Sequence, residues 1–186
     1  MRHIAFAKDP DGYWVEIIGL KDQVTTETDV TTYRMNHTMI RVKSAKESLK
    51  FYQDIMGMTL LRTSVNEGAK FNLYFLGYKR EGEVENESTT SDREGLLELT
   101  YNYGTDDPDS DFKGYYDGNS EPQGFGHICV VVDDLDAACD RFEELKVDWK
   151  KRLTDGRMRD VAFIKDPDGY WIEVVQNERI KRRKDW

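Results

Sequence analysis

Two histidines and two glutamates occupy equivalent places in two halves of this chain. His37 and His127 each lie near the start of a predicted strand that opens a half, and Glu98 and Glu173 lie among apolar residues in strands that close the halves. A lone buried glutamate is more often ion-paired, and a lone histidine is more often a hydrogen-bonded core residue. Because the pattern occurs twice, we favour a divalent metal site with positions left open for a substrate.

The elements that must position these residues form two units of the order β-α-β-β-β over residues 36–175. In the first, a helix begins at the capping box of Ser44 and Glu47 and ends at Gly57. In the second, Asp133 or Asp134 caps the helix. The predicted strands of the first unit are 37–42, 59–64, 70–78 and 95–103, and those of the second are 126–132, about 147–151, 161–165 and 170–175.

Residues 1–18 repeat residues 158–175, with twelve of eighteen positions identical and Glu16 aligned with Glu173. Both segments predict a β-hairpin around an Asp-Pro-Asp-Gly turn. We therefore expect residues 1–19 to be a hairpin remnant of a preceding copy and residues 20–34 to be a linker. A complete domain then covers residues 35–176, with modules 35–124 and 125–176, and residues 177–186 form a basic tail.

Composition excludes several classes of function. The net charge is −9, with 27 basic and 36 acidic residues, which argues against a nucleic-acid surface. The acidic stretches 81–87 and 105–111 are expected to be solvated loops, and the long loop 104–124 is more often functional than idle. No apolar run is long enough for a membrane helix, and no signal peptide is recognised. We expect a cytosolic protein in which Cys129 and Cys139 are buried and reduced.

Several strings of the complete copy resemble glyoxalase I (lactoylglutathione lyase), of the vicinal-oxygen-chelate superfamily. They are HTMIRVK, LYFLGY, ELTYNYG, DGNSEPQGFGHI and AFIKDPDGYWIEVV, and the resemblance covers about residues 36–176. The extra hairpin resembles the end of the first copy in a fungal-type, two-copy enzyme. The resemblance implies an α+β fold of tandem βαβββ modules, with mixed sheets that curl around a metal site.

The same resemblance implies the reaction and its ligands. The substrate would be the hemithioacetal of glutathione and methylglyoxal, with glutathione as co-substrate. The metal ligands would be His37, Glu98, His127 and Glu173, and the ion stays open between zinc, which we prefer, and nickel. Glu173 would be the base that moves a proton between adjacent carbons, and Glu98 would serve the opposite enantiomer. The metal would bind two vicinal oxygens of the substrate as a Lewis acid.

Residues for glutathione are implied less completely. Arg41 and Asn102 would bind the γ-glutamyl part, and Lys151 and Arg157 the glycine carboxylate, although each in isolation is simply a surface residue. Several relatives have arginine at the position of Gln123. The side chains expected to line a pocket, which taken alone would be ordinary core, are Phe71, Leu73, Phe75, Met158 and Phe163.

The partial repeat leaves open how a site is assembled. In one-copy relatives, two chains share each site, so His37 and Glu98 of one chain would meet His127 and Glu173 of another in a homodimer. In two-copy relatives, Glu16 would instead be the partner of His37 and Glu98. The alternative functions are another metalloenzyme of the same superfamily, and a ligand-binding or inactive fragment.

Overall fold

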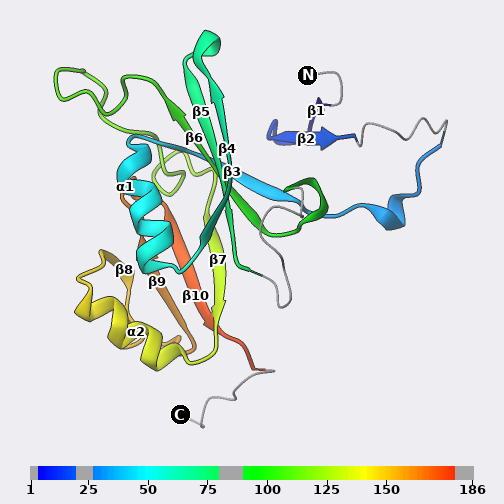
Figure 1. Ribbon diagram of the computed structural model, residues 1–186. Coiled ribbons are helices and arrows are strands. Elements are labelled where there is room, and N and C mark those ends of the chain that lie inside the picture. Colours follow the sequence, from blue (N-terminus) through cyan, green and yellow to red (C-terminus); the bar gives the residue numbers. More distant parts are fainter. Residues whose placement is uncertain (1–3, 20–26, 80–89, 179–186) are drawn as a thin grey trace.

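The computed structural model describes residues 4–19, 27–79 and 90–178, and these form two mixed four-stranded sheets and a separate hairpin (Figure 1). The predicted α+β fold of tandem βαβββ modules is confirmed, because each four-stranded sheet is built by one module with one main helix. None of the helices in the described ranges has the length and apolar character needed to cross a membrane.

The first module contains β3 (His37–Val42), α1 (Ala45–Lys50), β4 (Thr59–Asn66), β5 (Phe71–Gly77) and β6 (Leu96–Asn102). Its sheet has the order β3-β6-β5-β4, with β3 parallel to β6 and the other pairs antiparallel. The Ser44 side chain accepts from the Glu47 amide and caps α1, as predicted. The helix continues as a π-helical turn, η2 (Phe51–Ile55), and Gly57, with φ of +70°, ends it.

The second module contains β7 (His127–Val132), α2 (Leu135–Glu144), β8 (Trp149–Lys151), β9 (Val161–Lys165) and β10 (Trp171–Gln176). Its order, β7-β10-β9-β8, repeats that of the first module. Asp134 caps α2, since its carboxylate accepts from the Ala137 amide at 3.1 Å. Short 3-10 turns lie at Val30–Thr32, Glu67–Ala69 and Thr90–Asp92, and residues 103–126 contain neither helix nor strand.

The hairpin predicted at the start of the chain consists of β1 (Ile4–Lys8) and β2 (Trp14–Ile18), in antiparallel register. It lies beside the first sheet (Figure 1) and belongs to neither four-stranded sheet. Residues 20–26 of the predicted linker lie outside the described residues. The acidic stretch 81–87 and most of the basic tail also lie outside them.

The two modules share one apolar core. Alternate residues of β3 and β6 point into it from one sheet, and alternate residues of β9 and β10 from the other. Its largest fully buried side chains include Tyr52, Leu76, Leu99, Leu135, Ile164 and Ile172. Each sheet therefore turns its opposite face, which carries the histidine and the glutamate, away from the shared core.

One burial prediction was wrong. Cys129 is exposed, because it lies on the face of β7 that points away from the core. In the described part of the chain, neither cysteine forms a disulfide.

Candidate metal centre

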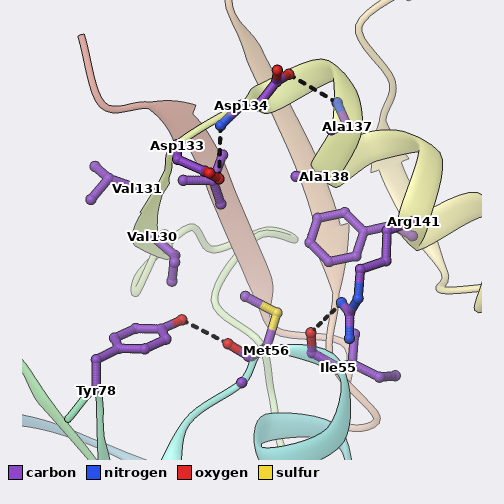
Figure 2. A pocket seen from close by; sticks show the side chains of 13 residues that line it. Ile55, Met56, Tyr78, Val130, Val131, Asp133, Asp134, Ala137, Ala138 and Arg141 are labelled. Carbon is purple, nitrogen blue, oxygen red and sulfur yellow. Dashed lines mark hydrogen bonds between the residues drawn. The ribbon is translucent and has the colours of Figure 1, made fainter. Parts of the chain in front are cut away.

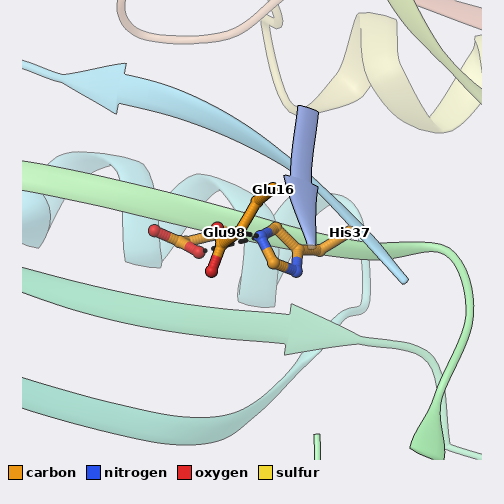
Figure 3. A group of neighbouring side chains, drawn as sticks. All are labelled: Glu16, His37 and Glu98. Atoms are coloured by element: carbon orange, nitrogen blue, oxygen red, sulfur yellow. Dashed lines mark ion pairs between the residues drawn. The ribbon is translucent and has the colours of Figure 1, made fainter. Parts of the chain in front are cut away.

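Glu16, His37 and Glu98 converge on the outward face of the first sheet (Figure 3). His37 Nε2 lies 3.1 Å from a carboxylate oxygen of Glu98 and 3.4 Å from one of Glu16. Glu16 comes from β2, His37 from β3 and Glu98 from β6. The hairpin therefore brings its carboxylate to a histidine and a glutamate on adjacent strands. Each offers a ligand atom within 4.8 Å of the others.

The two carboxylates of this cluster differ in their surroundings. Glu98 is buried, and one of its oxygens accepts from the Thr100 hydroxyl at 3.3 Å. Glu16 is more exposed and comes from a hairpin whose other side chains are largely solvated. Glu98 is thus enclosed and hydrogen-bonded, whereas Glu16 is more open to solvent.

The ring of His37 is held on two sides besides the carboxylates. Nδ1 lies 2.7 Å from the side-chain oxygen of Asn36, and Phe75 packs edge-on with ring centroids 5.6 Å apart. Hydrogen bonding to Glu98 raises the pKa of His37, and the charges of Glu98 and Glu16 act in the same direction against the lowering effect of burial.

His127 and Glu173 form a second, separate pair. Nε2 of His127 lies 3.1 Å from a Glu173 oxygen, and Phe163 packs edge-on against the ring at 5.3 Å, as Phe75 does against His37. Cys129 adjoins Glu173. Although the residue is exposed as a whole, partial desolvation of its thiol together with the charge of Glu173 raises the pKa of the thiol to about 11. The His127 side chain is 40% exposed, whereas that of His37 is 7% exposed.

The four predicted ligands therefore do not meet within one chain. His37 and Glu98 come together, and His127 and Glu173 come together, but each pair lies on its own sheet. Glu16 lies beside His37 and Glu98. It is the residue that aligns with Glu173 in the sequence repeat. Only the repeat could reveal this from sequence.

The residues predicted to bind the γ-glutamyl part share the face of Glu98. In the sheet register Arg41 pairs with Thr100, two residues beyond Glu98, and Asn102 follows two residues later. Phe71, Leu73 and Phe75 lie opposite Asn102, Thr100 and Glu98 on the same face. The Asn102 amide donates to the Tyr115 hydroxyl at 2.7 Å, which fixes its orientation.

The residues predicted for the glycine carboxylate belong to the second module. The Lys151 ammonium donates to the backbone carbonyls of Arg152, Met158 and Val161, at 2.7 to 3.2 Å. It therefore holds the loop before β9, a contact that charge alone did not predict. Arg157 and Met158 lie exposed in that loop, and Phe163 lies beside His127.

A depression of about 380 Å³ lies away from both pairs, between the end of η2 and the start of α2 (Figure 2). Arg141 donates to the carbonyls of Ile55 and Asp54 at 2.6 and 2.8 Å, and the Tyr78 hydroxyl donates to that of Met56. The Arg141 bonds join the two modules, whereas the Tyr78 bond lies within the first module. None of the predicted site residues lines the depression.

The first cluster has the donor set of a borderline divalent ion. One imidazole nitrogen and two carboxylates match the ligand types of catalytic zinc sites, which keep a position open for water or substrate. Nickel accepts the same ligand types. The cluster thus fits a divalent ion, whereas His127 and Glu173 alone provide only two ligands.

Comparison with known proteins identifies the family. The model of the Glyoxalase/Bleomycin resistance protein/Dioxygenase superfamily matches residues 34–174. The chain belongs to this superfamily. Among solved structures, it is similar to glyoxalase I from Leishmania major, with 34% identity, a TM-score of 0.59, and coverage of 80% of this chain and 90% of that one.

Curated relatives in the superfamily are glyoxalases. The chain is 50% identical to glyoxalase I of Saccharomyces cerevisiae, covering 96% of this chain but 54% of that protein, so it spans about half the length of this relative. It is 48% identical to the lactoylglutathione lyase of Pseudomonas putida, covering 82% of this chain and 91% of that one. The family resemblance predicted from sequence motifs is confirmed.

Proposed function

We propose that this chain carries glyoxalase I chemistry, the isomerisation of the glutathione–methylglyoxal hemithioacetal to S-lactoylglutathione. The observation that supports this most strongly is the convergence of Glu16, His37 and Glu98 in a chain that resembles lactoylglutathione lyases along most of its length. We also propose a cytosolic location, since cysteines outside disulfides, such as Cys129 and Cys139, are typical of reducing compartments.

In this proposal His37, Glu98 and Glu16 hold the ion, with zinc preferred and nickel the alternative. When bound, the ion would act as a Lewis acid toward two neighbouring substrate oxygens. Glu98 keeps its place because it is buried and bonded to Thr100. Glu16, the equivalent of Glu173, is the carboxylate with room to take a proton from one carbon and return it to the next.

The sheet face around Glu98 provides the substrate surface. Arg41 can bind a carboxylate with its planar guanidinium, and Asn102 adds an oriented amide from the neighbouring strand. Phe71 and Phe75 form an apolar surface that would pack against the substrate and exclude water. The resemblance extends this surface to Lys151 and Arg157. Both lie on the second module, so they would contact the substrate from a different module than the one that carries His37 and Glu98.

A second assembly of the site is a homodimer in which His127 and Glu173 of one chain face His37 and Glu98 of another. The exposure of His127 favours it, because a partly formed ligand pair on an open face can accept further ligands. The two assemblies differ in which glutamate acts as the base, since Glu16 occupies the place beside His37 that Glu173 of the other chain would take.

Turnover of the hemithioacetal by chelator-stripped protein, with zinc or nickel added back, tests the function. We expect restoration by one ion, and a loss of 100-fold or more in kcat for Glu98→Gln and Glu16→Gln. Folded protein that is inactive with both ions would instead support a ligand-binding or inactive fragment.

Glu173→Gln is the matched substitution that separates the two assemblies. In the assembly within one chain, Glu16→Gln abolishes turnover and Glu173→Gln leaves most of it. In the shared assembly, Glu173→Gln abolishes turnover and Glu16→Gln leaves most of it. Sedimentation equilibrium should then show a dimer.

A further inference from the structure

The side chain of Asn36, next to the candidate ligand His37, is held in one orientation. Its amide nitrogen donates to the carbonyl oxygens of Thr90 and Arg93, at 2.7 Å each. The backbone is also fixed, since the Asn36 carbonyl accepts from the Leu96 amide at 2.9 Å. The reverse orientation would place the amide oxygen against two carbonyl oxygens, so the orientation is determined by its partners.

This orientation presents the Asn36 oxygen to the His37 ring, 2.7 Å from Nδ1. An amide oxygen can only accept a hydrogen bond, so Nδ1 must carry the hydrogen. Nε2 is the atom that faces Glu16 and Glu98. A metal ion that binds Nε2 would replace the proton that bonds to Glu98, and the hydrogen on Nδ1 would remain. Histidine ligands commonly donate their second nitrogen in this way, which fixes the tautomer and the ring orientation.

His127 lacks this arrangement. The residue before it is Gly126, which has no side chain, and the nearby amide of Asn119 donates instead to the Gly126 carbonyl at 2.7 Å. Among the hydrogen bonds between described residues, the His127 ring bonds only to Glu173. The two histidines occupy equivalent places in the repeat, yet only His37 has an oriented acceptor at Nδ1.

We propose that Asn36 is a positioning residue that holds His37 in the Nδ1–H tautomer, so that Nε2 is ready to bind the metal ion of the first cluster. The inference rests on the proposed metal site and adds a residue that acts through His37 rather than on the substrate. It also predicts that the first cluster binds metal more tightly than the His127–Glu173 pair does.

Two substitutions separate positioning from plain structural support. Asn36→Leu removes both the acceptor and the two donors, whereas Asn36→Asp keeps an acceptor oxygen and loses the donors to Thr90 and Arg93. Both should lower the thermal midpoint of the metal-free protein. In competition titrations with Zn²⁺ alone, Asn36→Leu should weaken affinity by about 10- to 100-fold, and Asn36→Asp should stay within about threefold of wild type.

Asn119→Ala serves as the control, because it removes the amide near His127 and should leave the Zn²⁺ affinity of the first cluster unchanged. Equal losses in Asn36→Leu and Asn36→Asp, or no loss in either, would overturn the positioning role while leaving the metal site intact. A wild-type chain that fails to bind Zn²⁺ would overturn the proposed site and this inference together.

The wild-type protein also permits a test without any variant. In the zinc-loaded protein, ¹⁵N–¹H NMR of the His37 ring should show a slowly exchanging proton on Nδ1 and no proton on Nε2. A ring that carries its proton on Nε2, or an Nδ1 proton that exchanges as freely as in an exposed histidine, would contradict the assignment even if Asn36→Leu fails to fold.

Discussion

The two hairpins of this chain have nearly the same sequence but different surroundings. In β10, Ile172 and Val174 are completely buried in the shared core. Their counterparts in β2, Val15 and Ile17, are 50% and 54% exposed. Both form the same antiparallel ladder and the same Asp-Pro-Asp-Gly turn. Local sequence is therefore sufficient to form the hairpin, and its burial depends on what packs against it.

The turns show the same contrast. In both, the first aspartate accepts from the amides two and four residues later. Asp166 is also buried and accepts from the Tyr52 hydroxyl at 2.8 Å, which joins the second module to the first. Asp9 is only half-buried and bonds within its own turn. One turn is thus a contact between modules, and the other belongs to the hairpin that brings Glu16 to the candidate metal centre.

The largest expected difference between the turns is in pH dependence. Burial raises the pKa of Asp166 from 3.8 to about 7, so the folded protein keeps this proton where the unfolded chain has lost it. The stability that the group contributes is complete below about pH 4 and is lost as the pH rises to about 7. At about 1.4 kcal/mol per pKa unit, the change is about 4 kcal/mol.

Urea unfolding at a series of pH values measures this change. Asp166→Asn should flatten the profile between pH 4 and 7, and Asp9→Asn should leave it as in the wild type. A profile that keeps its slope in Asp166→Asn would assign the pH dependence to other groups, with Asp168 the first to consider because burial also raises its pKa.

The next largest difference is in core packing. Ile172→Ala should lower the free energy of unfolding by about 2–4 kcal/mol, because it leaves a cavity within the shared core. Val15→Ala at the equivalent position should change it by less than about 0.5 kcal/mol. Chemical denaturation measures both. A loss above about 2 kcal/mol in Val15→Ala would show that another surface covers this face of the hairpin in solution.

Much of the fold could be predicted because its signals are local. The Ser44 cap, the Gly57 stop and both hairpin turns depend on residues within a few positions of one another. The pairing of His37 with Glu98 is expected from the repeat. The exposure of Cys129 is not, because it depends on packing between residues that are distant in the sequence. The same limit applies to Lys151, whose bonds to three carbonyls depend on the path of a loop that charge patterns do not encode.

The smallest of these differences concerns the third residue of each turn. Asp168 accepts from the Lys43 amide at 2.8 Å and from the Ser48 hydroxyl at 3.3 Å, so it supports the start of α1 from the other module. Asp168→Ala should therefore cost about 1–2 kcal/mol of unfolding free energy, as the loss of a helix cap does. Asp11→Ala should cost less than about 0.5 kcal/mol, because Asp11 is exposed.

Amide hydrogen exchange distinguishes this local effect from a general loss of stability. In Asp168→Ala, exchange at Lys43 and along the first turn of α1 should speed up more than exchange in β9 and β10. If all of these amides changed equally, Asp168 would contribute to the whole domain rather than to the junction. If Asp11→Ala were as costly as Asp168→Ala, the first turn would also dock on a helix, and the contrast between the two hairpins would apply only to their apolar faces.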